Sequence, residues 1–168
     1  MKTTNYILLL LIAATIASCK VQYGFTQPKS VNADTFQVNR IENNALLIEP
    51  GLERDFKIAL EDLIQDQTNY TLVPSNGDLI YEGEITQYRV SPTTATADDR
   101  AAQNRLTIGV KIRFYNTNNE EDDVEKSFSF FYDYPGSAQL VGGQKVTAHE
   151  EIFERLTQDI INATLAKW

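Results

Sequence analysis

The stretch that decides the fold is residues 105–114, RLTIGVKIRF, in which polar and apolar side chains alternate without a break. Every even-numbered residue is apolar, and every odd-numbered residue is polar, charged or glycine. Because successive side chains of a β-strand point to opposite faces of a sheet, this period of two predicts a strand with one buried face and one wet face. The remaining sequence must supply neighbouring strands and a layer that covers the apolar face.

Three other segments predict strands beside this one. Residues 79–90, LIYEGEITQYRV, carry apolar side chains first at odd and then at even positions. A change of phase requires one extra residue, so we predict a β-bulge near Thr86-Gln87. Residues 128–134, FSFFYDY, alternate up to Pro135-Gly136, and a shorter stretch, 35–38, TFQV, predicts the first strand. The connections are expected at 91–103, as a long hairpin loop, and at 116–123, as a turn.

Two amphipathic helices are predicted to cover the sheet. The first should run from Leu52 to about Thr68, because apolar side chains recur at the spacing of one helix face: Leu52, Phe56, Ala59, Leu60 and Leu63. The second should start at Thr147, which with Glu150 fits a capping box, and end near Trp168. Its expected buried stripe is Phe153, Leu156, Ile160, Ala163 and Thr164.

The predicted order is therefore β-α-β-β-β-α, which is typical of an α+β fold. Two helices would pack on one face of a four-stranded, mainly antiparallel sheet. We expect one domain over residues 35–168, since a chain of this length supports a single core.

The N-terminus has the layout of a lipoprotein signal peptide over residues 1–18. Lys2 precedes an apolar run, and residues 16–19, IASC, resemble the lipobox at which such signals are cleaved. Cys19 is the only cysteine in 168 residues, so no disulfide can form within the chain. We expect Cys19 to carry lipid that anchors the protein to a membrane, and residues 19–34 to form a tether.

The charge balance limits the partners of the domain. The chain has 15 basic and 23 acidic side chains and a formal net charge of −8, and removal of the signal peptide takes away Lys2 as well. A strongly acidic domain is not expected to bind nucleic acid or an anionic lipid surface as a whole.

The residues needed for catalysis are sparse. His149 is the only histidine, and we interpret it as a solvated residue in the first turn of the last helix, because no second histidine could complete a metal site or a proton relay. The acidic run Glu120–Asp123 is interpreted as a charged turn, with calcium binding as the alternative. The sequence thus favours a protein that is not an enzyme and needs no cofactor or metal.

One region is locally positive in this acidic chain. Arg105, Lys111 and Arg113 should share the outward face of their strand, and Arg89 lies on the preceding strand. Such cations could meet phosphate groups of a lipid headgroup. The alternative is an ordinary solvated strand face.

Several segments in order resemble the LptE family of lipopolysaccharide-assembly lipoproteins. They lie after Cys19 at 23–25 YGF, 76–79 NGDL, 82–86 EGEIT, 88–90 YRV, 104–108 NRLTI, Phe128, 132–134 YDY and 159–162 DIIN, near Trp168. The resemblance implies a component of the outer-membrane machine that delivers lipopolysaccharide. Such a lipoprotein faces the periplasm, plugs and helps to assemble a wide LptD barrel, and can bind lipopolysaccharide.

For individual residues, the resemblance implies lipid on Cys19. Arg89, Arg105, Lys111 and Arg113 remain candidates for lipopolysaccharide binding on the ground of charge alone. The alternative function is a membrane-tethered module that binds a small amphiphile or peptide.

Overall fold

The computed structural model describes residues 31–93, 103–135 and 139–166. The predicted signal peptide, Cys19, the predicted tether up to residue 30 and most of the predicted 91–103 loop lie outside the described residues. The elements, in chain order, are β1 (Thr35–Asn43), α2 (Leu52–Gln67), β2 (Thr71–Leu72), β3 (Leu79–Thr93), β4 (Gln103–Asn116), the short helix η1 (Glu120–Asp122), β5 (Val124–Pro135) and α3 (Gly142–Thr164).

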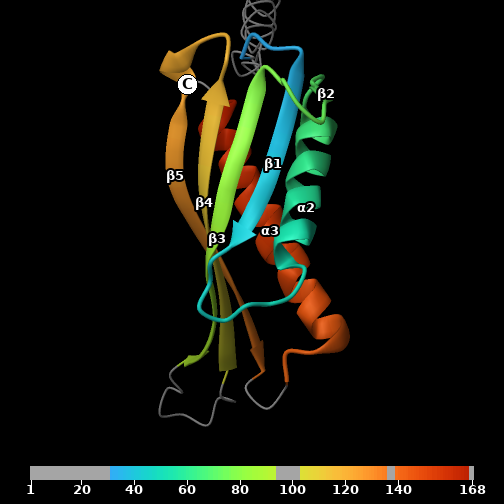
Figure 1. Cartoon of the computed structure of the whole chain (residues 1–168). Helices are drawn as coiled ribbons and strands as arrows, with labels where there is room; N and C mark the ends of the chain where they lie inside the picture. Colours follow the sequence, from blue (N-terminus) through green and yellow to red (C-terminus); the bar gives the residue numbers. More distant parts are fainter. Residues whose placement is uncertain (1–30, 94–102, 136–138, 167–168) are drawn as a thin grey trace, which may run out of the picture.

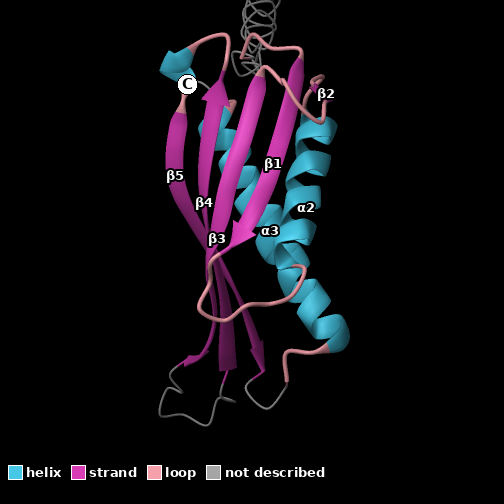
Figure 2. Cartoon of the chain, viewed as in Figure 1, coloured by secondary structure: helices cyan, strands magenta, loops and turns pink. Residues whose placement is uncertain are grey.

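The five strands form one curled sheet in the order β2-β1-β3-β4-β5, and both helices cover one of its faces (Figures 1 and 2). The α+β class and the single helical layer are confirmed. The prediction of four mainly antiparallel strands was wrong, because β1 pairs in parallel with both β2 and β3. Helix α2 returns the chain to the end of the sheet at which β1 begins, so β2 and β3 run in the direction of β1.

The missed strand is β2, which contains only Thr71 and Leu72. Two residues are too short to show an alternation. Two backbone hydrogen bonds flank the pairing with β1: the amide of Thr71 donates to the carbonyl of Asp34, and the amide of Val73 donates to that of Phe36, each at 2.9 Å.

The central part of the sheet agrees with the sequence. The even-numbered apolar residues of β4 from Leu106 to Phe114 are all buried. Ile85 pairs with Val110 and Gln87 with Gly109, so Thr86 is the extra residue and the predicted bulge is confirmed. A second irregularity between Val38 and Ile41 interrupts the alternation in β1, which is why the predicted strand 35–38 was too short.

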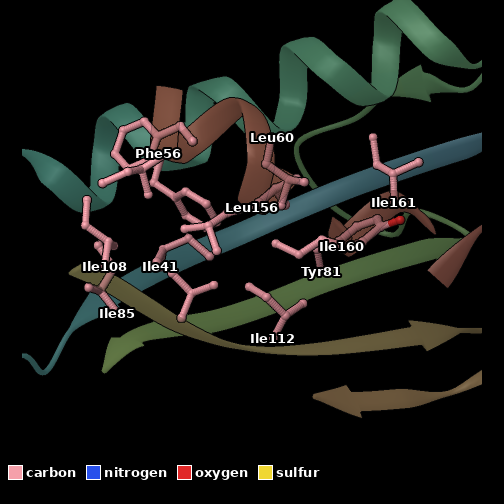
Figure 3. Packing of buried hydrophobic residues seen from close by; sticks show 14 of the residues in the cluster. Ile41, Phe56, Leu60, Tyr81, Ile85, Ile108, Ile112, Leu156, Ile160 and Ile161 are labelled. Carbon is pink, nitrogen blue, oxygen red and sulfur yellow. The ribbon is translucent and has the colours of Figure 1, made fainter. Parts of the chain in front are cut away.

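The core lies between the helices and the inner face of the sheet (Figure 3). Leu52, Phe56, Leu60 and Ile64 form the buried stripe of α2, whereas Ala59 and Leu63 are only partly buried. Tyr81 is fully buried, and its hydroxyl lies 3.0 Å from Thr164 Oγ1 of α3. Burial raises the pKa of the Tyr81 hydroxyl. This pair satisfies the polar atoms of both side chains inside the core.

Helix α3 begins at Gly142, so the prediction of a capping box at Thr147 was wrong. The preceding residue, Val141, provides no side-chain cap. The first turn is instead held by Lys145, whose Nζ donates to Glu49 Oε1 at 2.7 Å in the loop before α2. A tertiary ion pair therefore supports a helix start that local capping signals do not show.

Because α3 starts at Gly142, His149 lies in its second turn, and the interpretation of His149 as a solvated residue was wrong. His149 is half-buried, with Nε2 3.1 Å from the hydroxyl of Tyr88 and its ring stacked on that of Phe153. Burial lowers the pKa of His149; Glu49 and Asp55 oppose this effect, and Lys145 adds to it. The pKa of Tyr88 is raised to about 12, mainly by burial.

Gly83 permits the close approach of β3 and β4, because a Cβ at this position would lie 2.6 Å from the carbonyl oxygen of Lys111. We expect Gly83→Ala to lower the free energy of unfolding by about 1–3 kcal/mol, the usual cost of overpacking. Gly143→Ala is the control, because a Cβ there meets nothing within 4 Å. Urea denaturation measures both, and equal stability of the two variants would contradict the tight packing.

The stability of the domain should fall as the pH is lowered from 7.5 to 5.5. The pKa of His149 is lower in the folded than in the unfolded state, so the unfolded chain binds the proton first as the pH falls through about 6.5. In His149→Gln, which cannot titrate, the melting temperature should fall less over this range. Equal falls in both proteins, measured by circular dichroism, would assign the pH dependence to other groups.

Candidate functional site

The outer face of the sheet, opposite the helices, carries the predicted cations. The inner face takes the even-numbered residues of β4, so Arg105, Lys111 and Arg113 point outward together, as predicted. Arg89 pairs directly with Thr107 of β4, which places it on the same face. We call this set of four side chains the outer-face cations.

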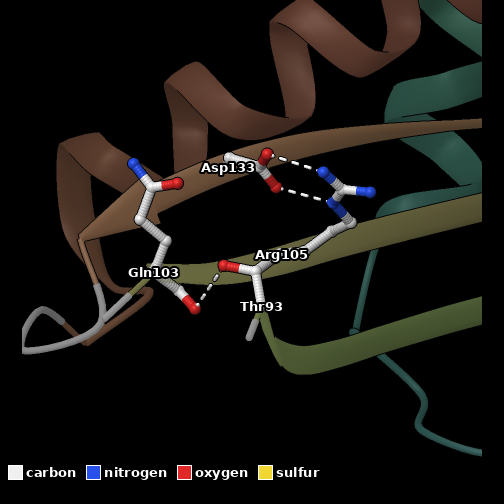
Figure 4. Close-up of polar contacts among 4 residues, drawn as sticks. All are labelled: Thr93, Gln103, Arg105 and Asp133. Atoms are coloured by element: carbon white, nitrogen blue, oxygen red, sulfur yellow. Dashed lines mark hydrogen bonds and ion pairs between the residues drawn. The ribbon is translucent and has the colours of Figure 1, made fainter. Parts of the chain in front are cut away.

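Arg105 is the most tightly held of the outer-face cations (Figure 4). Its Nε and Nη2 each donate to a carboxylate oxygen of Asp133 at 2.7 Å, and its guanidinium lies 3.6 Å from the ring centroid of Phe131. The hydrogen bonds raise the pKa of Arg105 and lower that of Asp133. Because the guanidinium forms two hydrogen bonds with one carboxylate and also stacks on a ring, the Arg105 side chain is held in one orientation.

The other two cations of β4 also have acidic partners. Lys111 Nζ lies 2.5 Å from Glu125 Oε1, and Arg113 Nε lies 3.9 Å from Glu82 Oε2. The contact with Lys111 lowers the pKa of Glu125. Sequence reasoning missed these acids because it did not establish the register of β3 and β5 against β4.

Arg89 differs from the other three, because it is exposed and forms no ion pair within the part of the chain that the structure describes. The outer face is therefore a set of paired charges with one uncompensated arginine. Exposed ion pairs contribute about 0–1 kcal/mol, so an anion with several oxygens could displace the carboxylates of Lys111 and Arg113 at little cost.

A second surface feature was missed by the sequence reasoning. Three consecutive aliphatic side chains are exposed in the loop between β1 and α2: Leu46 completely, Leu47 by 54% and Ile48 by 63%. Ordered contacts flank them, since the amide of Asn44 donates to the carbonyl of Ile85 at 2.9 Å and Lys145 pairs with Glu49. An apolar tip held in place in this manner is typical of an interaction surface.

Asp78 holds the start of the domain in place. Its Oδ2 accepts hydrogen bonds from the amides of Asp34 and Thr35, each at 3.0 Å, and from Thr35 Oγ1 at 2.9 Å. These bonds lower the pKa of Asp78. The nearby Val31 is buried, and its carbonyl accepts from the hydroxyl of Tyr70 at 2.9 Å. Residues 31–35 are therefore held on the domain by defined contacts.

The acidic run Glu120–Asp123 lies in the connection between β4 and β5, where its first three residues form η1. Asp123 Oδ1 accepts from the amide of Asn116 at 2.9 Å, and Asp122 Oδ2 accepts from its side-chain amide at 2.8 Å. These carboxylates close the turn. Among residues 31–93, 103–135 and 139–166, no group of three or more acidic or histidine side chains could hold a metal ion.

None of the helices in the described residues is both long and apolar enough to cross a membrane.

Three solved structures show the same fold at low sequence identity. A hypothetical protein from Chlamydia trachomatis is 9% identical, with a TM-score of 0.54 over 80% of this chain and 99% of its own. A protein from Xanthomonas campestris is 10% identical, with a TM-score of 0.55 over 79% and 84%. A minor lipoprotein from Acinetobacter baumannii is 11% identical, with a TM-score of 0.50 over 77% and 91%. At these identities the likeness concerns the fold alone.

No protein with curated annotation matches the sequence. The family model described as lipopolysaccharide-assembly, by contrast, matches residues 33–164, which contain every strand and helix of the domain. The resemblance first observed in separated segments thus extends over the whole fold, and the chain belongs to the LptE family.

Proposed function

We propose that this protein is a non-catalytic component of the outer-membrane complex that assembles lipopolysaccharide, in which it plugs an LptD barrel and assists its assembly. The observation that carries the proposal is the match of the LptE model to residues 33–164. That family consists of assembly lipoproteins without catalytic activity. The protein would be held by lipid on Cys19 at the periplasmic side of the outer membrane.

The shape and surface of the domain support this role. A strand of 15 residues such as β3 spans about 50 Å, longer than the hydrocarbon core of a bilayer, and wide barrels leave a lumen that a folded domain can fill. The start of β1 lies beside the start of β3, whereas the loop that follows β1 lies about halfway along β3, where the amide of Asn44 donates to the carbonyl of Ile85 (Figure 1). A protein anchored through its N-terminus could therefore present the exposed Leu46–Ile48 tip to a partner away from the anchor.

Purification of the tagged, processed protein in mild detergent tests the partner. We expect a large β-barrel to co-purify in near-equal molar amount. Replacement of both Leu47 and Ile48 by Asn should reduce the recovered barrel, because both side chains are exposed and available for contact. Recovery of the protein without any barrel would contradict the plug role. The intact mass of the same preparation reports whether Cys19 carries acyl chains.

We further propose that lipopolysaccharide contacts the outer-face cations Arg89, Arg105, Lys111 and Arg113. Phosphate groups can accept several charge-assisted hydrogen bonds from such side chains. Arg89 and Arg113 would contribute most, since the first is unpaired among the described residues and the second has an acidic partner only at 3.9 Å. Arg105 would keep its ion pair with Asp133 and would hold the ring of Phe131 in place.

The double variant Arg89→Glu with Arg113→Glu should weaken lipopolysaccharide binding about tenfold or more, which corresponds to a loss of about 1.4 kcal/mol. The matched control is Arg54→Glu with Arg155→Glu. This pair changes the net charge by the same amount, but at exposed positions of the two helices. Binding of labelled lipopolysaccharide measures both. If the two pairs of substitutions had the same effect, the outer face would not be the binding surface.

A further inference from the structure

A groove with a volume of about 570 Å³ lies between α2 and α3, and the proposed function does not use it. Two contacts mark its ends: Lys145 pairs with Glu49 at one end, and Gln67 Nε2 donates to Gln158 Oε1 at 2.7 Å near the other. It is lined by residues 55–66 of α2 and 146–157 of α3, so each wall has about three helical turns and a length near 18 Å.

The interior of the groove is apolar. Ala59 and Leu63 of α2 and Phe153 of α3 contribute to it, and Phe153 is almost completely buried. Ile58 and Val146 also line the groove, yet they are 46% and 52% exposed. Aliphatic side chains that face a hollow and remain in contact with water favour the binding of a second apolar surface.

Most polar residues of the groove are acidic; the others are His149 and Thr157, and none of the lining residues is Lys or Arg. Five carboxylates line it: Asp55, Asp62, Asp66, Glu150 and Glu154. Asp55 pairs with Arg54, while the other four form no ion pair with any described residue. The nearby Lys57 and Arg155 pair with Glu61 and Asp159, which do not line the groove. The groove therefore carries uncompensated negative charge along both walls.

This charge decides between possible occupants. A second copy of the chain would bring another acidic surface of the same kind, and an anionic lipid would also be repelled. A segment with an apolar face flanked by lysine and arginine would bury Ile58 and Val146 and neutralise the carboxylates. A helix of about three turns matches the length of both walls and is the form in which such segments enter apolar grooves.

We propose that the groove between α2 and α3 docks a basic amphipathic helix of a partner protein. This site lies on the helical layer, whereas the outer-face cations lie on the opposite side of the sheet. It does not depend on the lipopolysaccharide role, so either proposal can fail alone.

The test uses the mature chain from Lys20 without lipid, because detergent would bind an amphipathic peptide and because residues 31–166 include the complete core described above. The probe is a labelled 14-residue peptide with leucines on one helical face and lysines on both flanks, titrated by fluorescence anisotropy. Asp62→Lys with Glu154→Lys should weaken its binding at least tenfold. The matched control, Glu120→Lys with Glu121→Lys on η1, should change it less than twofold.

A second pair of variants tests the apolar part of the groove. Ile58→Asn should weaken peptide binding severalfold, whereas Val90→Asn, at a similarly exposed aliphatic residue outside the groove, should have no effect. Circular dichroism verifies that all variants are folded. A peptide of the same composition with a central proline, which cannot form the helix, should bind at least tenfold more weakly.

Several results would overturn the proposal. Equal losses in the groove and η1 charge variants would show binding to net charge alone, and equal binding of the proline peptide would assign the groove to an extended segment. The proposal also fails if the wild-type chain does not bind the helical peptide, or if sedimentation shows that it dimerises through Ile58.

Discussion

The pairing of β3 with β4 is the constraint on which the rest of the structure depends. Both strands are long, and each must keep its apolar side chains on the face that the helices cover. In β3 the apolar side chains lie at odd positions up to Ile85 and at even positions from Tyr88. The unpaired Thr86 absorbs this change of phase, so Tyr88 still points to the inner face. Without that extra residue, every side chain beyond it would point to the wrong side.

This pairing separates two surfaces of different character. On the outer face, cations of β4 lie beside acids of β3 and β5, and most of the charge is compensated locally. On the helical side, carboxylates surround an apolar groove without matching cations. The formal net charge of −8 is thus distributed unevenly, and the two faces suit ligands of opposite charge.

The contacts between helices and loops explain where sequence reasoning was wrong. Helix α3 starts before Thr147 because Lys145 reaches Glu49, a residue almost a hundred positions earlier in the chain. In this helix His149 lies within hydrogen-bonding distance of the Tyr88 hydroxyl, a contact between residues 61 positions apart in the chain. Capping patterns and hydropathy describe neighbours in the sequence, so they contain no information about such contacts.

The sequence by itself determined the α+β class, the inward and outward residues of β4, the extent of α2, the bulge at Thr86 and the family, because each depends on local periodicity or on ordered short motifs. Only the tertiary structure decided the parallel pairing of β1, the acidic partners of Arg105 and Lys111, and the groove between the helices. These features arise where distant segments meet, and their geometry depends on strand direction, register and helix packing, which no local pattern specifies.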